Sequence, residues 1–149
     1  MLSEQLHNKY NYIISKSIQM VASNVDSQDL GENIDYASIY AQSNEEFNTI
    51  EEELKNNGTV AIESNEGNYY KLTKPLKISN IEIYHCRIRA FDNEHPEIGY
   101  VDFEVKDYDQ FKKKYLSRLC FALLSSGEEM IELKDPNFSV RAYFLSGSF

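Results

Sequence analysis

An internal repeat constrains the fold more than any other feature of this sequence. Residues 35–47 (DYASIYAQSNEEF) match residues 99–111 (GYVDFEVKDYDQF) at a constant offset of 64 residues. In both segments an alternating run leads into a helix start, and a Phe follows one turn later. A shorter match relates residues 71–75 (KLTKP) to residues 132–136 (ELKDP). Such repetition in a short chain predicts two similar modules that share one core.

Each module is predicted to contain one strand, one helix and then three strands. The first strand of each module alternates apolar and polar side chains, which is the pattern of a sheet with two different faces. The predicted strands lie at residues 34–41, 59–64, 69–72 and 81–91 in the first module, and at 99–105, 121–125, 129–133 and 140–145 in the second. The predicted boundaries within one compact domain are 1–33 for an N-terminal helix and its connection, 34–91 for the first module, 92–97 for a linker and 98–149 for the second module.

Capping residues mark the start of the helix in both modules. Ser43 and Glu46 have the spacing of a capping box, and Asp107 and Gln110 repeat it in the second module. Gly58 is expected to end the first helix in a left-handed conformation. The apolar stripes expected to face the core are Phe47, Ile50 and Leu54 in the first helix and Phe111, Tyr115 and Leu119 in the second.

A further amphipathic helix is predicted outside the repeat, from residue 3 to about residue 24. Ser3 suits its N-cap, since a Ser side chain accepts a hydrogen bond from a free backbone N–H of the first turn. Its apolar stripe consists of Leu2, Leu6, Tyr10, Ile13, Ile14, Ile18 and Val21. We expect this stripe to pack on the repeated body, and a dimer contact is the alternative.

Composition and charge exclude several classes of partner. The chain has 42% hydrophobic and 26% charged residues, as globular proteins do. Its net charge of −9 argues against binding to nucleic acids or to anionic membranes, which attract basic surfaces. No apolar run approaches the roughly 20 residues of a membrane helix, and the N-terminus lacks a signal-peptide pattern. We therefore expect a cytoplasmic protein in which Cys86 and Cys120 stay reduced and at least partly buried.

These patterns predict an α+β fold in which two tandem βαβββ modules form a concave mixed sheet, preceded by an N-terminal helical extension. One face of each module is apolar and is expected to lie under its helix. The other face carries Tyr, Asp and Arg side chains and is too polar for an ordinary core. Two such sheets side by side would enclose a concave polar surface.

Basic and phenolic residues gather on this predicted concave face. Strand alternation places Cys86 and Ile88 on the covered side, so the intervening side chains point into the concavity. The candidate ligand-binding residues are Tyr36, Tyr40, His85, Arg87, Arg89, Tyr100, Asp102, Arg141 and Tyr143. Arginine forks match carboxylate and phosphate groups, so the face is predicted to bind a small anion. In the alternative interpretation, these arginines pair with acidic side chains and only keep the face soluble.

The arrangement resembles the vicinal-oxygen-chelate superfamily, which includes glyoxalase I and the extradiol dioxygenases, and within it the small YecM-like branch. The segments similar to that family are GYVDFEVKD at residues 99–107, EMIELKDP at 129–136 and YKLTKPL at 70–76. The resemblance covers about residues 34–145. It implies the paired βαβββ fold and, in metal-dependent members, four metal ligands on the first and fourth strands of the modules.

The residues at those four positions depart from the family pattern. Tyr36 and Tyr100 stand where the family has His, and the fourth-strand positions fall near Arg89 and near Arg141 or Ala142. Arginine has only donors, and a neutral Tyr is a poor metal ligand at pH 7. No cofactor is therefore predicted, with a divalent metal as the alternative.

Three functional hypotheses follow. The first is a non-catalytic or vestigial glyoxalase-like protein that binds a small anionic molecule in its concave face, so no catalytic residue is assigned. The second is a metal-dependent lyase, isomerase or dioxygenase with substituted ligands. The third is a protein–protein interaction module, and a homodimer is compatible with all three.

Overall fold

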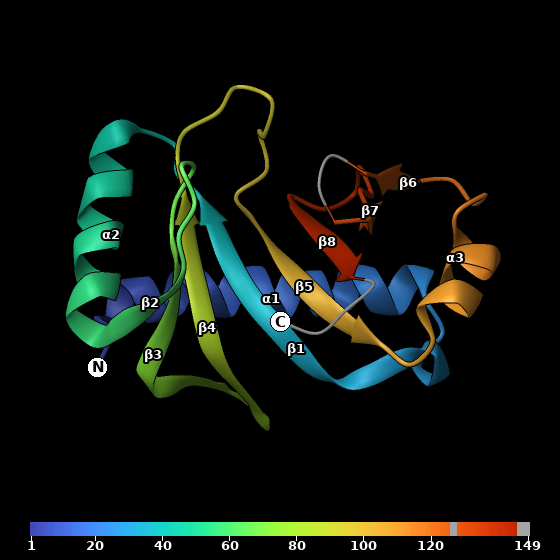
Figure 1. The fold of residues 1–149 in the computed structure, drawn as a ribbon, viewed down its shortest axis with the longest axis horizontal. Coiled ribbons are helices and arrows are strands. Elements are labelled where there is room, and N and C mark those ends of the chain that lie inside the picture. The colour runs from blue at the N-terminus through green and yellow to red at the C-terminus, as the bar shows by residue number, and fades with distance from the viewer. Residues whose placement is uncertain (126–127, 146–149) are drawn as a thin grey trace.

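The structure is a computed structural model that describes residues 1–125 and 128–145 (Figure 1). Its helices are α1 (Glu4–Asn24), α2 (Asn44–Asn57) and α3 (Tyr108–Tyr115), with a short 3-10 helix at Ser27–Asp29. Its strands are β1 (Leu30–Tyr40), β2 (Gly58–Ile62), β3 (Tyr69–Ile78), β4 (Ile81–Arg89), β5 (Gly99–Val105), β6 (Phe121–Leu124), β7 (Met130–Leu133) and β8 (Val140–Leu145). The order strand, helix and three strands therefore occurs twice.

All eight strands belong to one sheet, in the order β2-β3-β4-β1-β5-β8-β7-β6. The first strands of the two halves, β1 and β5, run antiparallel at the centre. Each also pairs in parallel with the last strand of its own half, β1 with β4 and β5 with β8. The predicted α+β fold with a curved mixed sheet and an N-terminal helix is confirmed.

Strand alternation gives the sheet two chemically different faces. One face contributes residues such as Ala37, Ile88 and Val101 to the main hydrophobic core, together with the buried stripes of the helices. The other face carries a separate group of buried phenols, which we call the tyrosine cluster. It consists of Tyr36, Tyr40, Tyr100 and Tyr143, with Tyr69, Leu124, Met130 and Leu145 packed against it.

Helix α1 lies across the back of the sheet and contacts β1, β5 and β8, so it spans both halves (Figure 1). The predicted N-cap is present, since Ser3 Oγ accepts a hydrogen bond of 3.2 Å from the Leu6 N–H. The buried Tyr10 hydroxyl donates to the Arg87 carbonyl of β4 over 2.9 Å. The predicted packing of this helix on the repeated body is confirmed. None of the described helices has the length and apolar character needed to cross a membrane.

The other predicted N-caps are also present, but two details at the ends of the helices differ from the predictions. Ser43 and Asp107 accept hydrogen bonds from the N–H groups of Glu46 and Gln110. Gly58 is extended rather than left-handed, because it opens β2 and packs closely on the Lys71 carbonyl. Leu119 is 90% exposed, because α3 ends at Tyr115.

Strand β3 is longer than predicted. It continues through Pro75 to Ile78 and joins β4 by a tight turn in which Ser79 has a φ of 56°. The pairing register shifts between Lys71 and Leu76, which accommodates a proline that cannot donate to a regular ladder. The predicted strand ends at residue 72, before this proline.

Gly99 lies where β5, β1 and α1 meet, and its position has no room for a larger side chain. A Cβ there would lie 2.4 Å from the Ser38 carbonyl oxygen and 2.6 Å from the Ile13 side chain. Gly99→Ala should therefore lower the free energy of unfolding by about 1–3 kcal/mol, or the melting temperature by roughly 3–10 °C. Thermal unfolding would measure this, with Ala61→Val on exposed β2 as the control. An unchanged melting temperature in Gly99→Ala would contradict the close packing.

Candidate functional site

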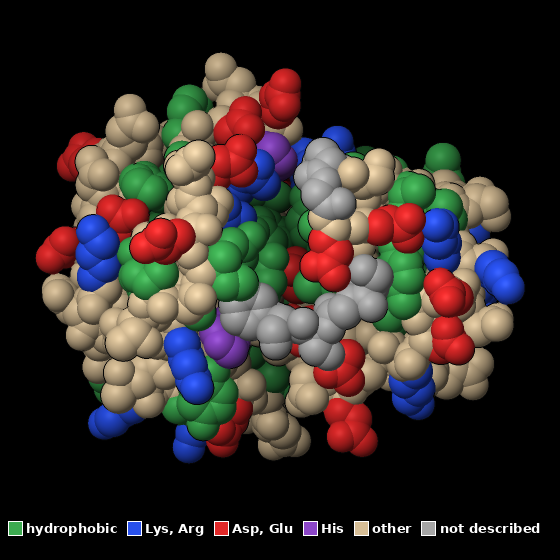
Figure 2. All heavy atoms as spheres, viewed as in Figure 1, with side chains coloured by type: hydrophobic (Ala, Val, Ile, Leu, Met, Phe, Trp, Pro, Cys, Tyr) green, Lys and Arg blue, Asp and Glu red, His purple; other side chains and the backbone are tan. Residues whose placement is uncertain are grey.

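A pocket of about 610 Å³ lies on the face of the sheet opposite α1. In the view of Figure 2, this face is hollowed at its centre, and hydrophobic side chains, a class that here includes Tyr, gather along the left side of the hollow. The residues that line the pocket are Tyr36, Ser64, Glu66, Tyr69, Arg87, Arg89, Glu94, His95, Tyr100, Asp102, Leu124, Glu128, Met130, Glu132, Arg141 and Tyr143. The pocket therefore draws on both halves of the chain.

The strand register brings the key side chains together. Tyr36 of β1 is opposite Asp102 of β5, which is opposite Tyr143 of β8, which is opposite Glu132 of β7. These four residues form one row across the sheet. In the neighbouring row, Ser38 stands between Arg87 on one side and Tyr100 on the other.

Arg87 is the central cation of the pocket, and it is only 4% exposed. Its Nη1 donates to the hydroxyls of Tyr69 and Tyr100, both over 2.9 Å. Its Nε donates to the Gly67 carbonyl over 2.9 Å, and its Nη2 to Ser64 Oγ over 3.2 Å. These four partners are neutral, and Arg87 forms no ion pair with the described acidic residues.

The turn at residues 64–68 supplies half of these contacts. Gly67 has a φ of +135°, and a Cβ there would lie 2.1 Å from the Ile88 carbonyl oxygen of β4. Only glycine fits this backbone and this close approach. The turn is also tied to β4 by the Ala90 N–H, which donates to the Glu66 carbonyl over 2.7 Å. Sequence reasoning missed Ser64, Gly67 and Tyr69 as part of the site, although the predicted strands at residues 59–64 and 69–72 leave this turn between them.

The other two arginines of the pocket are already neutralised. Arg89 pairs with Glu66 over 2.8 Å, as the alternative interpretation of acid-paired arginines predicts. Arg89 stands opposite Tyr40, at the end of β1, and not in the Asp102 row. Arg141 pairs with two carboxylates, Glu97 at 2.8 Å and Glu132 at 3.1 Å.

The Arg141 contacts also fix the linker between the modules. Its Nη2 donates to the Glu94 carbonyl over 3.1 Å, and its Nε holds the Glu97 carboxylate. Nearby, the His95 ring lies 4.8 Å from the Tyr40 ring. The linker thereby forms one wall of the pocket.

Asp102 is the most unusual group in the pocket. It is 1% exposed, and neither carboxyl oxygen has a hydrogen bond of regular length and angle. Burial raises its pKa to about 8, and the nearby charge of Asp35 also raises it, while the Tyr36 hydroxyl and Arg87 lower it. At pH 7 the folded protein therefore holds Asp102 mainly in its neutral form.

Phenol hydroxyls connect the remaining groups. Tyr143 donates to Glu132 Oε2 over 3.0 Å, and its oxygen lies 3.2 Å from the Tyr40 hydroxyl. The Tyr100 ring packs against Tyr40 and Tyr143, each with ring centroids 5.1 Å apart. Burial raises the pKa of each of these tyrosines, so they remain neutral hydrogen-bonding groups at pH 7.

The structure brings seven of the nine candidate residues to one pocket. They are Tyr36, Arg87, Arg89, Tyr100, Asp102, Arg141 and Tyr143. Tyr40 supports the pocket through its contact with Tyr143. His85 lies in the adjacent hollow with Asp35 and Lys71, so it shares the face but not the pocket. Whether any of these residues binds a ligand stays a prediction.

The donor set does not fit a divalent metal. In the register, Ser38 pairs with Arg87 and Asp102 with Tyr143, so Arg89 and Arg141 are not equivalent positions of the two halves. At the positions where the family has metal ligands, the pocket offers neutral phenols, which are poor ligands, and arginines, which have only donors. In residues 1–125 and 128–145, no three His, Cys, Asp or Glu side chains form a potential metal site.

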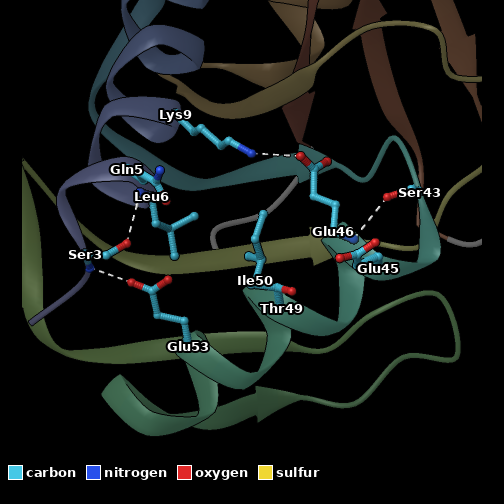
Figure 3. A pocket seen from close by; sticks show the side chains of 10 residues that line it. All are labelled: Ser3, Gln5, Leu6, Lys9, Ser43, Glu45, Glu46, Thr49, Ile50 and Glu53. Atoms are coloured by element: carbon cyan, nitrogen blue, oxygen red, sulfur yellow. Dashed lines mark hydrogen bonds and ion pairs between the residues drawn. The ribbon is translucent and has the colours of Figure 1, made fainter.

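A second hollow, between α1 and α2, is explained by contacts within the fold (Figure 3). Lys9 pairs with Glu46 over 2.7 Å, and Glu53 accepts a hydrogen bond from the Ser3 backbone N–H. Ser43 Oγ accepts the Glu46 N–H as the N-cap of α2. These groups join the two helices and leave no buried polar group that would call for a ligand.

Comparison with known proteins supports the fold alone. No family model and no curated protein sequence matches this chain. The chain is similar to a solved structure described as a structural genomics protein, Protein EC4020, with a TM-score of 0.65 and 10% sequence identity. The match covers 97% of this chain and 85% of that one. At this identity the likeness shows a shared architecture and says nothing of function.

The raised pKa of Asp102 predicts an unusual dependence of stability on pH. Below about pH 4 the carboxyl is protonated in both folded and unfolded chains. As the pH rises towards 8, the unfolded chain loses this proton while the folded protein keeps it, so Asp102 progressively destabilises the fold. Asp102→Asn should therefore be more stable than the wild type at pH 8, by about 2–5 kcal/mol.

Thermal melts at pH 4 and pH 8 would measure this difference. The gain should nearly vanish at pH 4, and Asp109→Asn on the exposed start of α3 should show no comparable gain. A wild type more stable than Asp102→Asn at pH 8 would contradict the neutral state of the buried carboxyl.

Proposed function

We propose that the protein binds a small molecule with an anionic group in the concave pocket, and that Arg87 is the residue that recognises the anion. The observation that carries this proposal is the buried Arg87 guanidinium, which lines the pocket and has only neutral hydrogen-bonding partners among the described residues. A buried charge without a counter-ion is costly, and an anionic ligand would lower this cost.

The geometry of Arg87 suits this role. A guanidinium has five N–H donors, and four hydrogen bonds to protein groups are present. Its plane is held from three directions by Tyr69, Tyr100 and the turn at Gly67. One Nη2 N–H therefore remains for a ligand, and a guanidinium that is already fixed in place loses little conformational entropy on binding a carboxylate or phosphate.

A purely structural role for Arg87 is the competing interpretation. In it, the side chain only holds the turn at residues 64–67 against β4. Arg141 shows what such a role looks like, because it fixes the linker and has two carboxylates as counter-ions. Arg87 fixes its turn without any such counter-ion, which favours the binding role.

The family remains part of the proposal. We propose that the chain is a non-catalytic relative of the vicinal-oxygen-chelate superfamily, in which an arginine-centred pocket replaces the metal site. The paired βαβββ order and the shared position of the pocket between the halves support this. A metal-dependent enzyme would retain stoichiometric metal after purification, and elemental analysis would detect it.

Replacement of Arg87 should weaken anion binding. We expect at least one compound in a panel of small carboxylates and phosphate monoesters to raise the melting temperature of the wild type. For that compound, Arg87→Gln should weaken binding about 10- to 100-fold in calorimetry, because a charge-assisted hydrogen bond is lost. Arg87→Lys keeps the charge without the fork and should fall between the two.

Arg118→Gln is the matched control, because Arg118 packs on Tyr115 near the end of α3, outside the pocket. It should bind the same compound as the wild type does. The proposal fails if no compound of the panel binds, or if folded Arg87→Gln or Arg87→Lys binds with wild-type affinity. Circular dichroism would establish that each variant is folded.

A further inference from the structure

The concave pocket contains a second buried group without a regular hydrogen bond, although the Tyr36 hydroxyl is close enough to lower its pKa. Asp102 lines the same pocket as Arg87, and neither of its carboxyl oxygens has a regular hydrogen bond. Buried polar groups are almost always satisfied, so this carboxyl calls for a donor from outside the chain. A ligand that only carried an anionic group could accept a hydrogen bond from the neutral carboxyl, but it would bring no donor for the other carboxyl oxygen.

The charges around the pocket also disfavour a simple anion. Its lining includes three arginines, of which Arg89 and Arg141 are paired. The same lining includes five acidic residues, namely Glu66, Glu94, Asp102, Glu128 and Glu132. With Asp102 neutral, the four glutamates still outnumber the three arginines, so a dianion would meet net repulsion, whereas a molecule that carries both charges would not.

We propose that the ligand is a small amino acid or a similar zwitterion, with its carboxylate on the Arg87 guanidinium and its ammonium group on Asp102. This inference rests on the proposed function of the Arg87 pocket and names its ligand class. Tyr100, which accepts from Arg87, and Asp102 stand two residues apart on β5 and on the same face. This places them about 7 Å apart along the strand, a span that an α-amino acid can bridge.

The tyrosine cluster suits an ammonium group as well. The Tyr143 ring stands at 88° to the Tyr100 ring, and Tyr36 stands at 76° to Tyr100. Rings set at such angles around a carboxyl present both faces and hydroxyls to a bound cation. Aromatic faces attract ammonium ions, so the rings would add to the attraction of Asp102.

Binding of an ammonium group should expel a proton. The titratable and charged groups around Asp102 are Asp35 and Tyr36 from β1, Arg87 from β4, Tyr100 from β5 itself and Tyr143 from β8. With its pKa raised to about 8, Asp102 is mainly protonated at pH 7 before binding. Its proton would pass to the buffer, and the ligand ammonium would then face the carboxylate.

Matched pairs of compounds test this inference in calorimetry at pH 7. The pairs are leucine with 4-methylpentanoate, phenylalanine with 3-phenylpropanoate, and glutamate with glutarate. Each pair differs only by the amino group. At least one amino acid should bind ten times or more tightly than its partner. Its binding heat should change between buffers of different ionisation enthalpy, as release of close to one proton requires.

Two substitutions of Asp102 make the test specific. Asp102→Asn and Asp102→Ser should both reduce the preference for the amino compound to about threefold or less and abolish the proton release. Serine is chosen because Ser38 occupies the equivalent position in the first module. Asp35→Asn, whose carboxyl lines the adjacent hollow, should retain the preference.

The outcomes separate this inference from the proposed function. If both members of every pair that binds do so equally well, and Arg87→Gln weakens them, the anion site stands and the zwitterion inference is wrong. If the preference survives in folded Asp102→Ser, Asp102 is not the ammonium site and the inference is also wrong. If no compound binds in these pairs or in the anion panel, both proposals fall.

Discussion

The antiparallel pairing of β1 with β5 is the contact on which the rest of the structure depends. It joins the two modules into one sheet, and it places Tyr36 beside Asp102 and Ser38 beside Tyr100. Because Ser38 is small and fully buried, the Arg87 side chain can reach from β4 across β1 to the Tyr100 hydroxyl. A shift of this register by one residue would exchange the two faces of a strand, so that side chains of the tyrosine cluster would point into the main hydrophobic core. The pocket therefore depends on this single register of the β1–β5 pairing, which we call the seam.

Burial of charge explains why the arginines of one face differ so much in their surroundings. Arg89 and Arg141 each have carboxylate partners, and this offsets the cost of removing them from water. Arg87, which reaches Tyr100 across β1, and Asp102, on β5 itself, have no such partners among the described residues. A protein without a ligand tolerates this arrangement only because its main hydrophobic core, covered by three helices, supplies the missing stability.

The sequence predicted most of the architecture, since its signals are local. The caps at Ser43 and Asp107 and the strands β5 and β8 lie where capping and alternation placed them. Alternation also assigned Arg87 and Arg89 to the correct face. It could not tell which arginine is central, because this depends on strand register and on the turn around Gly67. The extension of β3 past Pro75 escaped prediction for a similar reason, since a register shift absorbs the proline.

The two modules share an order of elements but not a chemistry, and this difference decides what kind of molecule the pocket suits. Asp102 occupies the position that Ser38 has in the first module, and Tyr143 the position of Arg87. The first half therefore contributes an unpaired cation and the second half an unpaired acid, on either side of the seam. A symmetric pocket with two identical halves would favour a symmetric ligand. This pocket has one positive and one acidic side, so it favours one orientation of a molecule that has two different ends.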